Sequence, residues 1–196
     1  MKRKSISILM FIFRALSITV VLCGSSMRIF LHGCLWWECA PKRIFHVRDW
    51  ELPASLFPDG ALVGNISASS EGTGETERGT QTIFWTYGGA GYRIYRYATS
   101  RRAISKYDFE VNHMVDYETN MPWAKPTQLT FHSATADSVH IACGNGLQGT
   151  ECGFTGRYQE YVIYYSSSID EERMTFKDFE EILIYINEQI SNRLYP

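Results

Sequence analysis

The sequence predicts an α+β fold, with a single antiparallel sheet, an internal helix and a long C-terminal helix packed on one face. Two observations carry this prediction. Short runs of aromatic and β-branched residues follow one another between glycine-rich and polar turn signals, which is typical of antiparallel strands. The C-terminal segment instead holds one apolar stripe at helical spacing, and such a stripe needs a sheet to lie on. A chain of 196 residues, 45% of them hydrophobic, can bury one domain-sized core.

Residues 1–37 are predicted to deliver the chain to a membrane. Lys2-Arg3-Lys4 precedes an apolar run that extends to Leu22 with a single interruption at Arg14, which is the charge order of a secretory signal. Leu31-His32-Gly33-Cys34 resembles the lipobox of bacterial lipoprotein precursors. The resemblance implies that Cys34 is lipidated and becomes the mature N-terminus.

Two other fates of this segment stay open. An uncleaved anchor would span about Ala15 to Trp37, at the cost of holding Arg28 within the membrane. Simple signal cleavage would follow Gly24 or Ser25 instead. All three alternatives keep the basic end in the cytoplasm, so we expect the folded domain on the extracytoplasmic face of a membrane, in the cell envelope.

The charge distribution argues against nucleic acid as a partner. Every charged residue before Glu38 is basic, and removing residues 1–33 leaves 14 Lys and Arg against 21 Asp and Glu, a net charge of −7. A domain this acidic repels phosphate backbones. No run of basic residues interleaved with aromatics reverses that field locally.

Residues 38–60 are predicted to form an ordered connector, because their prolines, charges and aromatics follow no helical or alternating period. The extracytoplasmic α+β domain is expected to occupy residues 61–196. The connector should attach to it through its large apolar residues, which are Trp50, Leu52, Leu56 and Phe57. Residues 61–68 are predicted to form a strand, and the polar stretch 69–79 a surface loop.

A β-hairpin is predicted next, from two aromatic and β-branched runs at residues 81–87 and 92–97. Gly88 to Gly91 separate the runs and have the composition of a turn. The aromatic residues concentrated here form a possible binding surface for a protein or a carbohydrate: Trp85, Tyr87, Tyr92, Tyr95 and Tyr97. Cross-strand packing of these rings inside the sheet is the alternative.

Two helices and several strands complete the predicted fold. Thr99 or Ser100 can cap the internal helix, which should run to about Val111. Further strands are predicted at residues 114–118, 127–133, 138–143 and 157–165. Thr175 caps the final helix. Its stripe consists of Phe176, Phe179, Ile182, Leu183, Ile186, Ile190 and Leu194.

The cysteines predict at least one disulfide. Cys143 and Cys152 bracket a glycine-rich loop and can close it as a hairpin. Cys34 and Cys39 can form a second bridge if Cys23 leaves with a signal, whereas lipidation of Cys34 would leave Cys39 as an odd thiol. The loop itself, residues 144–149, matches the dinucleotide pattern GxGxxG. No helix follows it to receive a pyrophosphate, so we expect no cofactor.

Two histidines are candidate metal ligands. If the predicted strands 127–133 and 138–143 pair with their apolar residues matched, His132 lies opposite His140. Two imidazoles could hold a metal ion or respond to pH, yet zinc sites use three or four ligands. No further ligand stands at a helpful spacing on these strands. We therefore expect a solvent-facing polar pair, with the metal site as the alternative.

For the whole chain we predict a membrane-anchored, non-catalytic extracytoplasmic domain that binds a protein partner or serves an envelope complex as an accessory subunit. No GxSxG, SxxK or HExxH motif occurs. Two alternatives remain. A sensor or binding module for a small ligand would need an apolar cavity beneath the helices. An envelope hydrolase would bring a serine, cysteine or carboxylate to His113, His132 or His140 within a cleft.

Overall fold

The computed structural model describes residues 14, 16–27, 34, 38–69, 75–116, 118–146 and 149–196. The chain divides into two compact units, residues 1–39 and 40–196. In the first unit, residues 16–27 are helical and a disulfide joins Cys34 to Cys39. Within the described residues, no helix is both long enough and apolar enough to cross a membrane. Much of the predicted 15–37 span lies outside those residues.

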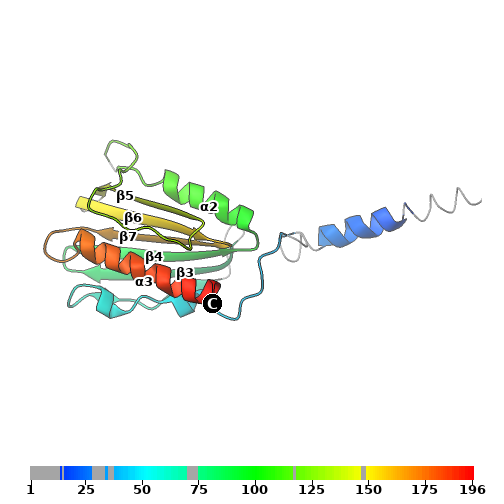
Figure 1. The fold of residues 1–196 in the computed structure, drawn as a ribbon, viewed down its shortest axis with the longest axis horizontal. Coiled ribbons are helices and arrows are strands. Elements are labelled where there is room, and N and C mark those ends of the chain that lie inside the picture. Colours follow the sequence, from blue (N-terminus) through cyan, green and yellow to red (C-terminus); the bar gives the residue numbers. More distant parts are fainter. Residues whose placement is uncertain are drawn as a thin grey trace, which may run out of the picture. The chain divides into compact units, whose positions relative to one another are not determined.

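The second unit is built on one antiparallel sheet (Figure 1). Within the described residues its strands are β1 (Leu62–Val63), β2 (Ser67–Ser69), β3 (Glu75–Trp85), β4 (Gly88–Tyr97), β5 (Ser138–Gly146), β6 (Gly149–Tyr158) and β7 (Tyr161–Ser168). They lie in the order β1-β3-β4-β7-β6-β5, and β2 pairs with β3 beside β1. The helical elements are η1 (Val47–Trp50), η2 (Ala54–Leu56), α2 (Ser100–Asn112) and α3 (Phe176–Leu194). The predicted α+β fold is confirmed.

Several strand boundaries differ from the predicted ones. The β3–β4 turn is Thr86–Tyr87, in which Tyr87 has φ of 65°, and Gly88 to Gly91 belong to β4. Residues 157–165 contain two strands, because Gln159, with φ of 56°, reverses the chain between β6 and β7. Two-residue turns with positive φ match the twist of antiparallel strands, and non-glycine residues fill them here. The first half of β3, residues 75–79, was predicted as loop.

Two predicted strands are not formed. Of residues 114–118, those that the structure describes contribute one isolated bridge, between Val115 and Pro122. Residues 127–133 run as irregular chain, although Leu129 and Phe131 are buried in the core. The backbone amide of Thr130 donates to the Glu180 side chain at 2.9 Å, so α3 takes a donor that a neighbouring strand would otherwise bind.

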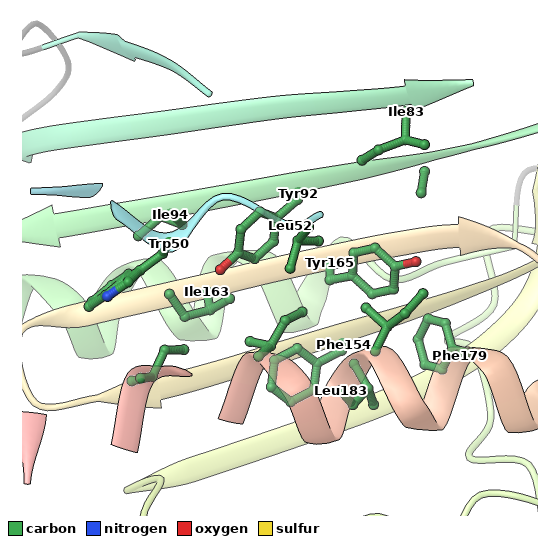
Figure 2. Packing of buried hydrophobic residues seen from close by; sticks show 14 of the residues in the cluster. Trp50, Leu52, Ile83, Tyr92, Ile94, Phe154, Ile163, Tyr165, Phe179 and Leu183 are labelled. Atoms are coloured by element: carbon green, nitrogen blue, oxygen red, sulfur yellow. The ribbon is translucent and has the colours of Figure 1, made fainter. Parts of the chain in front are cut away.

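One face of the sheet carries the main core. Side chains of β3, β4, β6 and β7 converge there on the buried stripe of α3 (Figure 2). The predicted members of that stripe are buried from Phe179 to Leu194, and Phe176 is partly buried. Thr175 caps α3 in a capping box with Asp178, as expected for a helix that begins at this point.

The two helices lie on opposite faces of the sheet, whereas the sequence predicts both on one. Tyr95 of β4 and Val162 of β7 pack with Ala103 of α2 in a second, smaller cluster. Tyr95 follows Ile94 in β4 and Val162 precedes Ile163 in β7, and both isoleucines belong to the main core. Because successive strand residues point to opposite faces, α2 covers the face that α3 does not.

The connector is an integral part of the second unit. Trp50, Leu52 and Phe57 are buried in the main core, and Leu56 is partly buried against it, as predicted. The buried Gln81 side chain accepts from the Leu52 amide and donates to the Leu52 carbonyl, both at 2.9 Å. At the other end of the sheet, Arg43 forms a two-pronged ion pair with buried Glu160 at 2.8 and 3.0 Å.

Adjacent residues of α3 provide a matched test of this packing. Leu183→Ala should lower the free energy of unfolding by about 2 to 5 kcal/mol, because Leu183 is fully buried and its loss leaves a cavity. Ile184→Ala should change it by less than about 0.5 kcal/mol, because Ile184 is exposed. Urea unfolding of the full chain, followed by tryptophan fluorescence, measures both. Equal effects would contradict the assigned helix face.

Candidate binding site

The face that α2 contacts is left bare near the β3–β4 turn. Gly89 and Gly91 alternate in step with Tyr95, so their missing side chains would point to the α2 face. The strand register sets Phe84 of β3 opposite Gly89 and Thr82 opposite Gly91. Residues opposite one another in an antiparallel pair share a face, so Phe84 and Thr82 also point to the α2 side.

The cross-strand rows that these β3–β4 pairs begin continue across β7 and β6. Ser166 lies opposite Gly91, and Ser168 lies opposite Glu151. The Ser168 hydroxyl lies 3.3 Å from both the amide nitrogen and the carbonyl oxygen of Gly89, which fixes it between β4 and β7. One cross-strand row therefore runs from Phe84 through Gly89 and Ser168 to Glu151, and the next runs from Thr82 through Gly91 and Ser166 to Gly153.

This arrangement leaves a hollow of about 520 Å³ in the sheet surface. Its lining residues are Thr82, Ile83, Phe84, Trp85, Tyr87, Gly88, Gly89, Ala90, Gly91, Gly149, Thr150, Glu151 and Ser168. The floor is low because of glycine: a Cβ at position 91 would meet only the Ser166 hydroxyl, at 3.7 Å. On the side toward α2 the hollow ends at a cross-strand pair with large side chains. There the Arg93 guanidinium lies over the Tyr164 ring, 5.3 Å from its centre.

Two aromatic rings at the hollow face solvent. Phe84 is 59% exposed and Tyr87 is 87% exposed. The Arg173 guanidinium lies 5.2 Å from the centre of the Tyr87 ring and donates to the Thr86 carbonyl, so the turn is held from the α3 side. Contiguous apolar surface that remains exposed on a folded domain is a candidate contact with a partner, and Phe84 lies opposite Leu62, which is 74% exposed.

The predicted aromatic binding surface divides accordingly. Trp85, Tyr92, Tyr95 and Tyr97 are buried, which matches the packing alternative, and Tyr87 alone is exposed. Phe84 was not among the predicted surface residues. Its exposure follows from the alternation within β3, where its neighbours Ile83 and Trp85 point to the main core.

Glu151 is the acidic group of the hollow. It is half-buried, and burial raises the pKa of its carboxyl above the ordinary value, against the opposing effects of a Ser166 hydrogen bond and the Arg93 charge. The carboxylate lies over the Cα of Gly146, where a larger residue would collide with it. Local structure thus keeps an acid in a place that disfavours its charged form, a pattern enriched at functional sites.

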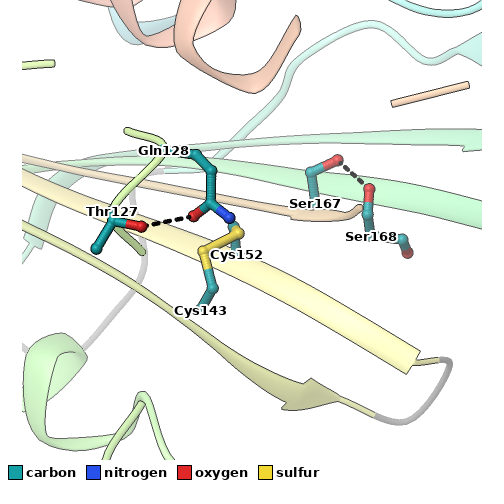
Figure 3. Close-up of a disulfide and its surroundings, with 6 residues drawn as sticks. All are labelled: Thr127, Gln128, Cys143, Cys152, Ser167 and Ser168. Atoms are coloured by element: carbon teal, nitrogen blue, oxygen red, sulfur yellow. Dashed lines mark hydrogen bonds between the residues drawn. A yellow bond between two sulfur atoms is a disulfide. The ribbon is translucent and has the colours of Figure 1, made fainter. Parts of the chain in front are cut away.

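The predicted disulfide between Cys143 and Cys152 is confirmed (Figure 3). The two residues are directly opposite in β5 and β6, with Cα atoms 4.1 Å apart. The amide and carbonyl of Cys143 both bond to Ala124, on the other side of the strand. Cys143 therefore faces Cys152 as a non-hydrogen-bonded pair, the closer kind in an antiparallel ladder. The bridge anchors β6 immediately next to Glu151.

The predicted pairing of His132 with His140 is not formed. β5 pairs with β6, which puts Thr155 opposite His140, and His132 lies exposed on irregular chain. Burial lowers the pKa of His140. Within the described part of the chain, no three His, Cys, Asp or Glu side chains are grouped so that they could hold a metal ion.

Cys34, the predicted lipidation site, forms a disulfide with Cys39. A sulfur atom in a disulfide cannot also carry a thioether-linked lipid, so the bridge and the lipid exclude each other in one molecule. The state in the structure is the second bridge, which was one of the two predicted fates of these cysteines.

Comparison with known proteins adds no family to this description. No family model, no curated protein and no solved structure matches the chain. The chemistry of the hollow is therefore the basis for a functional proposal.

Glu151→Gln should stabilise the protein at neutral pH. Since the folded-state pKa of Glu151 is raised, the wild type loses stability as pH rises from 4.5, the ordinary value for this carboxyl, through the raised value. Glutamine carries no charge to desolvate, so the gain should vanish below pH 4.5. Thermal unfolding at a series of pH values measures this, with Glu188→Gln on the exposed side of α3 as the control for net charge. A loss of stability at every pH would contradict the assignment.

Proposed function

We propose that this protein is a non-catalytic binding protein of the cell envelope, associated with a membrane through its N-terminal segment, and that its domain docks a protein partner at the hollow. The observation that carries the proposal is the pair of exposed rings, Phe84 and Tyr87, beside a glycine floor on an otherwise packed sheet. Aromatic residues are enriched at protein interfaces, and a low floor admits a partner's side chain.

The cysteines support an extracytoplasmic location. Two disulfides, Cys34–Cys39 and Cys143–Cys152, are consistent with an oxidising compartment, since thiols of cytosolic proteins are usually kept reduced. The basic residues at the N-terminus and the acidic balance of the remainder favour the same orientation.

The shape of the hollow favours a macromolecular partner over a small ligand. Small-molecule sites bury most of the ligand surface within a cleft. This hollow is a shallow part of a sheet face, open above its glycine floor, and its exposed rings stand at the edge. The space between the sheet and α3 is occupied by large buried side chains, Tyr92, Phe154 and Tyr165 among them.

The hydrolase alternative has less support. Among the residues that the structure describes, no histidine lines the hollow. The Nδ1 atom of His113 lies 2.6 Å from the carbonyl oxygen of Phe109, at the C-terminal end of α2. The Nδ1 atom of His46 lies 2.6 Å from the Glu77 carboxylate, beside η1. Both contacts lie within local structure that they stabilise.

Thiol counting in cells tests the proposed location. Before reduction, maleimide-polyethylene glycol should tag at most one cysteine of the denatured full chain, Cys23, because the other four are bridged. Reduction should add four tags. Lipidation of Cys34 would instead expose Cys39 before reduction and add lipid mass. Four or more tags without reduction would place the domain in a reducing compartment and overturn the proposal.

Site-directed photo-crosslinking tests the docking face. p-Benzoylphenylalanine at position 84 or 87 should give a discrete cross-linked product in intact cells, because both side chains are exposed at the hollow. The same probe at Ile184, exposed on α3 at the opposite face, is the matched control. Two results would show that this face does not dock a partner. The probes at positions 87 and 184 could give identical cross-linked products, or the probes at positions 84 and 87 could give no cross-linked product.

A further inference from the structure

We propose that the hollow accepts a basic side chain, lysine or arginine, from an extended segment of the partner, with an apolar residue of the same segment packing on Phe84. The inference rests on the proposed function and adds the chemistry of the partner. Its first basis is charge complementarity, because Glu151 is the only charged residue among the described side chains that line the hollow.

The nearby basic side chains do not form an ion pair with Glu151, although the charge of Arg93 acts on it from a distance. Arg93 lies over the Tyr164 ring, and Arg173 lies over the Tyr87 ring while donating to the Thr86 carbonyl. Among the residues that the structure describes, no Lys, Arg or His nitrogen lies within 4.0 Å of the Glu151 carboxylate. A cation from outside would supply the ion pair that this half-buried acid lacks, and charge-assisted hydrogen bonds of this kind are strong.

The two ends of the hollow set the spacing of the partner's side chains. Phe84 and Glu151 lie on β3 and β6, which are three strand spacings apart, or about 14 Å. An extended segment advances about 3.3 Å per residue, so four residues span about 13 Å. An even separation also puts both side chains on the same face of the segment. The partner sequence is therefore a basic residue and an apolar residue four positions apart.

The aromatic end suits the same segment. The Phe84 ring can pack on an apolar side chain or on the methylene stem of a neighbouring basic one. Between the ends, Gly91 leaves room for the backbone of the partner, since a Cβ there would meet only the Ser166 hydroxyl, at 3.7 Å. The hollow thus has one contact for charge, one for apolar surface and a clear path between them.

Peptide binding to the isotope-labelled full chain in detergent micelles tests this inference. The probe is acetyl-Lys-Ser-Ser-Ser-Phe-amide, and the control peptide replaces lysine with norleucine, which has a similar length and no charge. The lysine peptide should shift the backbone amide signals of Gly89, Gly91 and Gly149 in a saturable manner. It should bind about tenfold more tightly than the norleucine peptide, as expected for one charge-assisted contact.

Variants of the protein complete the test. Glu151→Gln should weaken the lysine peptide about tenfold and leave the norleucine peptide unchanged. Glu188→Gln, which removes the same charge on α3, should affect neither. Unchanged amide signals from the rest of the sheet would show that Glu151→Gln remains folded.

The outcomes separate this inference from the proposed function. Equal affinity for the two peptides, or no effect of Glu151→Gln, would overturn the requirement for a cation while a cross-link from position 87 still supports docking. Absence of binding by either peptide would also overturn the inference. Absence of both peptide binding and the cross-link would overturn the proposed function as well.

Discussion

Alternation of side chains along β4 and β7 is the constraint on which the rest of the structure depends. Ile94 and Ile163 must meet α3, and their neighbours Tyr95 and Val162 then need cover on the other face. α2, with 13 residues, is about 20 Å long, whereas the 10 residues of β4 extend about 33 Å. α2 therefore covers only one end of that face. Residues 118–126 cover another part, where Trp123 packs on Gly144 and Gly153. The remaining area, over the glycines of β4, stays open.

The open area lowers the stability of the fold, and this cost indicates that the area serves a function. Glycine inside a strand is destabilising by roughly 0.5 to 1 kcal/mol relative to alanine, and β4 begins with three glycines among its first four residues. Burial of the Glu151 carboxylate adds a further penalty at neutral pH. At Gly91 a purely structural sheet face would gain from a larger side chain, because a Cβ there would meet only the Ser166 hydroxyl. Proteins retain such unfavourable features mainly where a site needs them, and the exposed rings of Phe84 and Tyr87 lie at this edge.

The sequence predicted what local patterns control. The α3 stripe, its Thr175 cap, the Cys143–Cys152 bridge and the buried connector residues all follow from spacing or composition. The face chosen by α2 did not follow, because β4 and β7 are apolar on both faces and periodicity cannot assign a helix to one. Residues 127–133 alternate like a strand, yet their backbone bonds to α3, a tertiary choice that no short window contains. The hollow was missed for the same reason: its two rows join residues of four strands, and only the register shows that Phe84, two glycines and Glu151 share one face.

Filling the floor of the hollow tests the central claim most directly. A Cβ at position 91 would meet only the Ser166 hydroxyl, in ordinary contact at 3.7 Å, so Gly91→Ala can be accommodated without moving the backbone. The free energy of unfolding should rise by about 0.4 to 1 kcal/mol, because the unfolded chain loses conformational freedom. When Gly91→Ala is combined with the photo-crosslinker at position 87, the yield of cross-linked partner should fall, because the added methyl group fills the floor where the partner enters. A more stable protein whose cross-linking is undiminished would contradict the account, since it would show that the bare glycine face plays no part in binding.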